Sequence, residues 1–226
     1  ILKHSPNVSG CAVRIRDMFR EADFPKNLAE VILVSDKNVH EVSEGIISDD
    51  RIKAVTLTGS GKAGSAVASS AGSAIKKCVL ELGGSDPAII LEDADLGDAA
   101  RQTVFSRLIN SGQNCIASKR IIVVESAYRR FLDFLVSEME AGKMGDPMKM
   151  DVDLGPMAKY DLRDKLHRQV TKSIELGAKL ITGGTIPDHR GAFYPSTVLT
   201  GCGKGMPVFD EETFGPVAAV CTARDE

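Results

Sequence analysis

Residues 54–64 read AVTLTGSGKAG, where a run rich in β-branched residues passes directly into a turn of the form Gly59-x-Gly61-x-x-Gly64. Such a run is typical of a strand, and the small residues of 66–71 continue as a predicted helix. A strand, a glycine-rich turn and a helix in this order offer backbone N–H groups to a pyrophosphate. The spacing equally suits a tight turn for close helix–strand packing, so it leaves both interpretations open.

The sequence on either side of this turn alternates between helical and strand periods. Short loops between the elements predict a βαβαβ unit, which implies a parallel, Rossmann-like sheet with right-handed crossovers. Asn7 or Ser5 could cap the first helix, Pro6 is acceptable at a first helical position, and Cys11 would lie on the apolar face of this helix. The predicted helices of this part cover 7–22 and about 39–47, and its strands cover 31–34, 54–58 and 77–82.

A second α/β unit is predicted after residue 83. The topology therefore indicates two partial domains, one over 1–83 and one over 84–226. Strand-like segments lie at both ends of the chain, so we expect it to be an internal piece of a longer protein. The predicted strands of the second part are 88–91, 121–124, 179–182, 194–199 and 217–221, its helices are 95–110, 126–140 and 162–174, and 142–158 is an irregular connection.

Composition excludes several classes of protein. Lys plus Arg is 28 and Asp plus Glu is 31 in 226 residues, so no basic excess points to a nucleic acid partner. No apolar run approaches the roughly 20 residues of a membrane span, so no membrane partner is expected. The five cysteines are scattered, with no CxxC pair and no zinc-like spacing. We expect a reducing, cytoplasmic location without a signal peptide, and no bound metal.

Two further residues are candidates for chemistry. Cys115 ends the polar loop NSGQNC, where a thiol can be reached by substrate, although a loop cysteine is more often structural. Glu81 ends a predicted strand and precedes Gly83 and Gly84, so it lies where open α/β sheets place their ligands, although a solvent-facing charge is the simpler interpretation. The four histidines share no motif, and each is expected on the surface, His167 on a solvated helix face.

Taken together and in order, these motifs resemble the aldehyde dehydrogenase superfamily, especially bacterial succinate-semialdehyde dehydrogenases. The resemblance extends over the whole chain, which would correspond to the central part of an enzyme about twice as long. The narrower likeness rests on 5–8, 76–80 and 161–164. The matching motifs are TGS at 58–60 with Gly64, LELGG at 80–84, GQNC at 112–115 and EETFGPV at 211–217.

The resemblance implies that 1–83 is a partial dinucleotide-binding domain and 84–226 a partial catalytic, thiol-bearing domain, and it implies a role for each motif. Cys115 would be the nucleophile that forms a thiohemiacetal and then a thioester, and its backbone N–H would help to hold the oxyanion. Glu81 would be the general base that activates the hydrolytic water. The residues implied in cofactor binding are Lys3, Gly59, Ser60, Gly64, Leu82, Glu212 and Phe214.

The implied function is NAD(P)-dependent oxidation of a small aldehyde, succinate semialdehyde, to the carboxylic acid. Pro6 stands where many members carry a glutamate that repels a 2′-phosphate, so the cofactor is NAD or NADP. The parent enzyme would be a homo-oligomer. Two alternatives stay open: a truncated, non-catalytic nucleotide-binding fragment, and an acylating dehydrogenase that passes the thioester to another acceptor.

Overall fold

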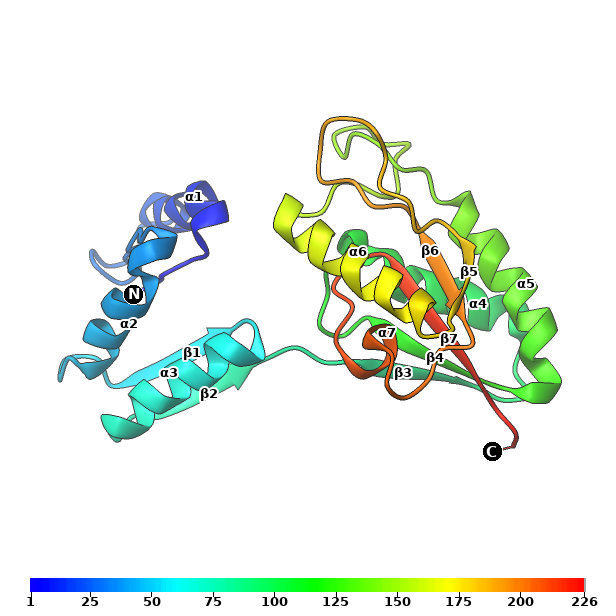
Figure 1. Cartoon of the computed structure of the whole chain (residues 1–226). Helices are drawn as coiled ribbons and strands as arrows, with labels where there is room; N and C mark the ends of the chain where they lie inside the picture. The colour runs from blue at the N-terminus through cyan, green and yellow to red at the C-terminus, as the bar shows by residue number, and fades with distance from the viewer. Residues whose placement is uncertain (226) are drawn as a thin grey trace. The chain divides into compact units, whose positions relative to one another are not determined.

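A computed structural model describes residues 1–225 of the chain (Figure 1). The chain divides into two compact units, Ile1–Leu82 and Gly83–Glu226. Among the described residues, no helix is long and apolar enough to cross a membrane. Within the same residues, no cluster of three or more His, Cys, Asp or Glu side chains could hold a metal ion.

The first unit is built around a two-stranded parallel sheet. β1 pairs with β2 in a register that places Thr58 opposite Glu81, and α3 connects the two strands and packs against both. The β-branched residues of β1 favour an extended strand. The small and polar residues of α3 are compatible with a helix that packs on the sheet. The elements are η1 (Pro6–Val8), α1 (Ser9–Glu21), η2 (Asp36–Asn38), α2 (Val39–Ser48), β1 (Ala54–Thr58), α3 (Gly61–Ser73) and β2 (Lys77–Glu81).

Several expectations for this unit are wrong. Residues 31–34 form no strand: Val31 makes only an isolated parallel bridge with Leu2, because no other described segment pairs with that run. The sheet therefore has two strands instead of three. Neither Ser5 nor Asn7 caps the first helix through its side chain. Cys11 is exposed, because the buried side of α1 is at the next residue, Ala12.

The second unit contains a five-stranded sheet in the order β3-β4-β7-β6-β5. The first four strands are parallel, and β5 runs antiparallel to β6. The short helix α7 was not predicted. The elements are β3 (Asp86–Ile90), α4 (Leu96–Leu108), η3 (Ile109–Gly112), β4 (Ser118–Val124), α5 (Glu125–Ala141), α6 (Tyr160–Glu175), β5 (Lys179–Thr182), β6 (Thr197–Thr200), α7 (Pro207–Asp210) and β7 (Val217–Ala223).

Both faces of this sheet are buried, because side chains of a strand alternate between its faces. In β7, Ala218 and Val220 pack into a core with α4 and α5, whereas Val217 and Ala219 pack into a second core with α6 and α7. In Figure 1, α6 lies in front of the sheet and α4 behind it. A continuous apolar run is typical of such a doubly covered parallel strand.

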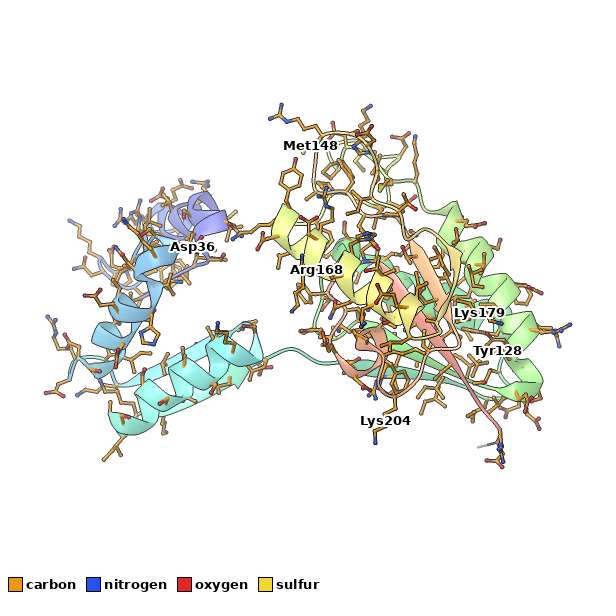
Figure 2. The ribbon with its side chains drawn as sticks, viewed as in Figure 1. Asp36, Tyr128, Met148, Arg168, Lys179 and Lys204 are labelled. Carbon is orange, nitrogen blue, oxygen red and sulfur yellow. The ribbon has the colours of Figure 1, made fainter. Side chains whose placement is uncertain are left out.

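Polar side chains cover the outside of the second unit. Figure 2 shows the labelled Lys204 projecting from it, and Arg168, Lys179 and Lys204 are all exposed. The expectation for His167 needs a correction: its ring is half-buried, and Nδ1 lies 3.2 Å from the Tyr194 hydroxyl, because α6 turns that position toward the second core.

Candidate active site

The predicted glycine-rich turn and Glu81 lie at the same edge of the first unit's sheet. The Gly59 N–H donates to the Glu81 carbonyl oxygen over 2.9 Å, which ties the turn to the end of β2. The Glu81 residue itself is exposed. A carboxylate is thus available at the carboxyl ends of two parallel strands, where open α/β sheets bind ligands.

The turn leads into the N-terminus of α3. Ser60 caps this helix, since its Oγ accepts from the Ala63 N–H over 3.3 Å. Gly64 is buried against Leu82, and a Cβ at position 64 would lie 2.6 Å from Leu82 Cδ2. Close packing therefore explains the third glycine. The first turn of an α-helix still presents N–H groups without helical acceptors, which suit an anion such as a pyrophosphate.

Lys3 lies beside the isolated bridge of this unit. The Leu2 N–H donates to the Glu30 carbonyl over 2.7 Å, and the Ile32 N–H donates to the Leu2 carbonyl over 2.9 Å. Lys3 follows directly and is half-buried. These two backbone hydrogen bonds of Leu2 therefore fix the chain immediately before Lys3.

The loop that carries Cys115 begins with an unusual backbone. Asn110 and Ser111 adopt left-handed conformations, with φ of 54° and 56°, and Gly112 follows at φ 72°. A Cβ on Gly112 would lie 2.3 Å from the carbonyl carbon of Gly215. Only glycine fits this close approach, so the backbones of the GQNC and TFGP motifs are in direct contact.

Side-chain hydrogen bonds fix the rest of this loop. Gln113 Oε1 accepts from the Ala158 N–H over 2.9 Å, and Asn114 Oδ1 accepts from the Ile116 N–H over 3.2 Å. Cys115 is half-buried, and its Sγ lies 3.9 Å from Asn114 Oδ1. Of the other described cysteines, Cys202 is buried, Cys11 is exposed, and Cys78 and Cys221 are half-buried like Cys115 but lie in the strands β2 and β7. The Cys115 thiol thus combines partial access with a fixed backbone, as a nucleophile requires.

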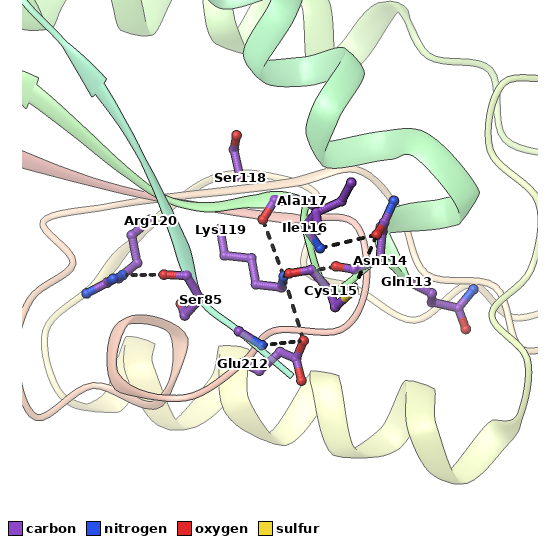
Figure 3. Close-up of polar contacts among 12 residues, drawn as sticks. Ser85, Gln113, Asn114, Cys115, Ile116, Ala117, Ser118, Lys119, Arg120 and Glu212 are labelled. Carbon is purple, nitrogen blue, oxygen red and sulfur yellow. Dashed lines mark hydrogen bonds and ion pairs between the residues drawn. The ribbon is translucent and has the colours of Figure 1, made fainter. Parts of the chain in front are cut away.

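Glu212 lies next to this loop and is half-buried. Its Oε1 accepts from the Gly84 N–H over 3.2 Å and lies 3.7 Å from Lys119 Nζ. Gln169 on α6 holds the segment in place, since its Nε2 donates to the Glu212 carbonyl oxygen over 3.2 Å. The second unit therefore brings Gly84, Cys115 and Glu212 to one place (Figure 3).

Phe214 lies two residues beyond Glu212 and is 39% exposed. The intervening Thr213 is fully buried, as is Gly215. The alternation turns Phe214 outward while its neighbours anchor the segment, so an aromatic ring is available beside Glu212. Cys115 and Glu81 belong to different units.

Two buried cations lie beneath the Cys115 loop. Lys119 and Arg107 are both 0% exposed. Arg107 donates to the carbonyl oxygens of Gly112 and Ser118. Burial lowers the pKa of Arg107 to about 10, against the opposing effect of Glu212. Burial also lowers the pKa of Lys119, and Arg107 acts in the same direction.

Sequence reasoning gave no role to either cation, although each left a signal. Lys119, Ile121 and Val123 alternate along β4 and are all fully buried, so the lysine occupies a core-facing position of a strand. Arg107 lies on α4 three residues after the buried Val104 and beside the buried Leu108. A cation at a position where the periodicity of its helix or strand predicts a buried apolar residue indicates a buried polar contact.

Comparison with known proteins gives the relationship of the chain. The model of the aldehyde dehydrogenase family matches residues 1–226. The chain is 47% identical over 225 residues to succinate semialdehyde dehydrogenase [NAD(P)+] of Escherichia coli, covering 100% of this chain and 48% of that relative. It is 44% identical over 225 residues to succinate-semialdehyde dehydrogenase [NADP(+)] of Mycobacterium avium, covering 100% of this chain and 47% of the relative.

A solved structure shows the same fold. Succinic semialdehyde dehydrogenase from Streptococcus pyogenes, in complex with NADP+ as the cofactor, superposes with a TM-score of 0.90 at 35% identity, covering 98% of this chain and 48% of that one. The chain spans about half the length of the curated relatives it matches. The predicted α/β fold of aldehyde dehydrogenase type is thereby confirmed, and the chain belongs to the aldehyde dehydrogenase family.

Proposed function

We propose that this chain supplies the nucleophile and the general base of an NAD(P)-dependent aldehyde dehydrogenase that converts succinate semialdehyde to succinate. The observation that carries the proposal is the half-buried Cys115 on a loop locked by the Gly112–Gly215 contact, with Glu212 beside it. The relatives named for this activity in Escherichia coli and Mycobacterium avium support the choice of substrate.

In the proposed mechanism the Cys115 thiolate adds to the aldehyde carbon and forms a thiohemiacetal. The developing oxyanion accepts a hydrogen bond from the Cys115 N–H, which stabilises the charge. A bound NAD(P)+ would supply the hydride acceptor, so that oxidation of the thiohemiacetal carbon would leave a thioester on Cys115. Glu81 then takes a proton from water, the water oxygen forms a bond to the acyl carbon, and the C–S bond breaks to release the acid and the Cys115 thiolate, while Glu81 holds the proton.

The residues present fit a dinucleotide cofactor. The capped N-terminus of α3 provides backbone N–H groups for a pyrophosphate, with Gly59, Ser60 and Gly64 at the turn. We assign Lys3 to the adenosine side and Glu212 with Phe214 to the nicotinamide side, and we include Leu82 among the residues that bind the cofactor. In this assignment 1–83 is the cofactor-binding part and 84–226 the thiol-bearing part. The NADP+ complex of the Streptococcus pyogenes relative supports NADP as one cofactor.

The test measures reduced-cofactor absorbance when succinate semialdehyde is added with NAD+ or NADP+. Cys115→Ala should abolish turnover, while Cys11→Ala, which alters an exposed thiol, should leave it unchanged. Full turnover in the Cys115→Ala variant would refute the proposal. Cofactor binding by calorimetry without any oxidation would favour the non-catalytic alternative.

A second variant isolates the proposed base. Glu81→Gln should give a burst of one reduced cofactor per site and then stall, because the thioester forms but is not hydrolysed. Steady turnover equal to that of the unaltered protein would reject this role. If the unaltered protein turns over only when coenzyme A or phosphate is present, and not by hydrolysis alone, the acylating alternative is favoured. We also propose a homo-oligomer, which sedimentation of the full protein tests.

A further inference from the structure

The ammonium of Lys119 is buried directly beneath the Cys115 loop and touches it in three places. Its Nζ donates to the carbonyl oxygens of Asn114 over 2.9 Å, Cys115 over 2.8 Å and Ala117 over 3.3 Å (Figure 3). An ammonium has three N–H donors, so these carbonyls use its full capacity. We propose that Lys119 is a positioning residue that aims the backbone of Cys115 and stabilises negative charge at its thiol.

The orientation of the Cys115 N–H follows from the geometry of the peptide bond. In a trans peptide the C=O and the next N–H point in opposite directions. The Asn114 carbonyl points inward to Lys119, so the N–H of Cys115 points away from the buried ammonium. The same holds for the Cys115 carbonyl and the N–H of Ile116, which donates to Asn114 Oδ1. Lys119 thus turns the N–H that the proposed mechanism uses for the oxyanion toward the outside of the loop.

Two buried cations lie beneath the loop, and the carboxylates that act on them are less buried. Lys119 and Arg107 are both 0% exposed, and the Arg107 guanidinium holds the carbonyls of Gly112 and Ser118 at the two ends of the loop. Among the described residues, Glu212 is the one carboxylate within ion-pair distance of Lys119, at 3.7 Å. Asp86 also interacts electrostatically with Lys119, but it is exposed and lies beyond ion-pair distance. Two buried cations with one half-buried carboxylate in ion-pair distance favour an anion nearby, and the thiolate is the reactive form of cysteine.

Glu212 therefore has a second effect besides its proposed contact with the cofactor. It neutralises part of the charge of Lys119, so its removal should strengthen the positive potential at Cys115. Loss of Lys119 and loss of the Glu212 charge are expected to change the reactivity of the thiol in opposite directions. General damage to the fold would not produce this opposition, because both substitutions remove contacts of the same loop.

The experiment measures the rate at which iodoacetamide alkylates Cys115 in the full chain near neutral pH, by mass spectrometry of the peptide that carries it. Lys119→Met should slow the reaction by about tenfold, as expected for removing a charge several ångströms away at intermediate dielectric. Glu212→Gln, which keeps an acceptor for the Gly84 N–H, should accelerate it by about threefold. Lys204→Met, which removes an exposed lysine, is the matched control and should leave the rate unchanged.

A folded Lys119→Met variant that is alkylated as fast as the unaltered chain would overturn the proposal, as would slower alkylation in Glu212→Gln. Circular dichroism and thermal unfolding establish that each variant is folded. If Lys119→Met does not fold, Lys119→Gln, which retains N–H donors but not the charge, replaces it with the same expected direction. This inference rests on the proposed function. Alkylation of Cys115 requires no turnover, however, so failure of the inference and failure of the proposed function give different results.

Discussion

The two units of this chain follow the same α/β pattern, but they differ in what their sheets bury. In the first unit the buried apolar side chains are Ala12, Ile47 and Ala71, and every residue of its two strands is exposed or half-buried. In the second unit β6 is buried throughout, and the first four residues of β7 are buried too. Similar local patterns therefore form similar elements in both units, whereas burial decides how firmly the surrounding structure holds a site. The Cys115 loop is attached to the well-packed unit.

The largest expected difference concerns two thiols, one in each unit. Cys11 is exposed, whereas Cys202 is 5% exposed and burial raises its pKa to about 12. Native-state alkylation should modify Cys11 at least about a thousand times faster, because Cys202 reacts only through opening of the second core. Mass spectrometry of the two peptides over time checks this. Alkylation rates within tenfold of each other would contradict the difference in burial between the two thiols.

Two glycine substitutions should separate the units next. Gly112→Ala should lower the free energy of unfolding by about 3 kcal/mol or more, since it combines a left-handed backbone with a clash against Gly215. Gly61→Ala should raise it by about 0.4–1 kcal/mol, because no atom lies within 4 Å of its Cβ position and alanine restricts the unfolded chain. Urea unfolding measures both. A tolerated Gly112→Ala would contradict the close approach.

A smaller effect is the pH dependence that Cys202 contributes. Its pKa in the folded chain, about 12, lies above the ordinary 9.0, so the folded state retains the proton more strongly. The thiol's contribution to stability is complete below pH 9 and is lost as the pH rises toward 12.

The stability difference between the unaltered chain and Cys202→Ala should therefore shrink by about 1.4 kcal/mol between about pH 8 and about pH 10. Arg107 and Lys119 have lowered pKa values and act with the opposite sign, but both proteins contain them and the difference cancels their effect. Urea unfolding at the two pH values is the measurement. A constant difference would show that Cys202 is solvated in the folded chain.

The smallest effect should be equal in the two units, because helix caps are local. Ser60 Oγ accepts from the Ala63 N–H at the start of α3, and Asp95 Oδ1 accepts from the Asp98 N–H at the start of α4. Ser60→Ala and Asp95→Ala should each cost about 1 kcal/mol. Thermal unfolding of the two variants measures this, and a cost confined to the second unit would show that α3 does not depend on its cap.

Most elements were predictable from the sequence, because their residues specify them locally. The helix over 7–22 is observed as η1 and α1, the strand at 54–58 as β1, and the irregular connection at 142–158 lies between α5 and α6. The run at 31–34 failed because a strand exists only where another segment pairs with it, and its sequence does not say which segment does.

The motifs around Gly59, Glu81, Cys115 and Glu212 were also present in the sequence, and they identified the family because their order is more specific than any one of them. Only the tertiary structure revealed the contact of Gly112 with Gly215 and the position of Lys119 beneath the Cys115 loop. Gly112 and Gly215, about a hundred positions apart, meet through the pairing of β4 with β7, which no local pattern encodes. A buried lysine is costly without partners, and its partners are backbone carbonyls that only the folded loop turns toward it.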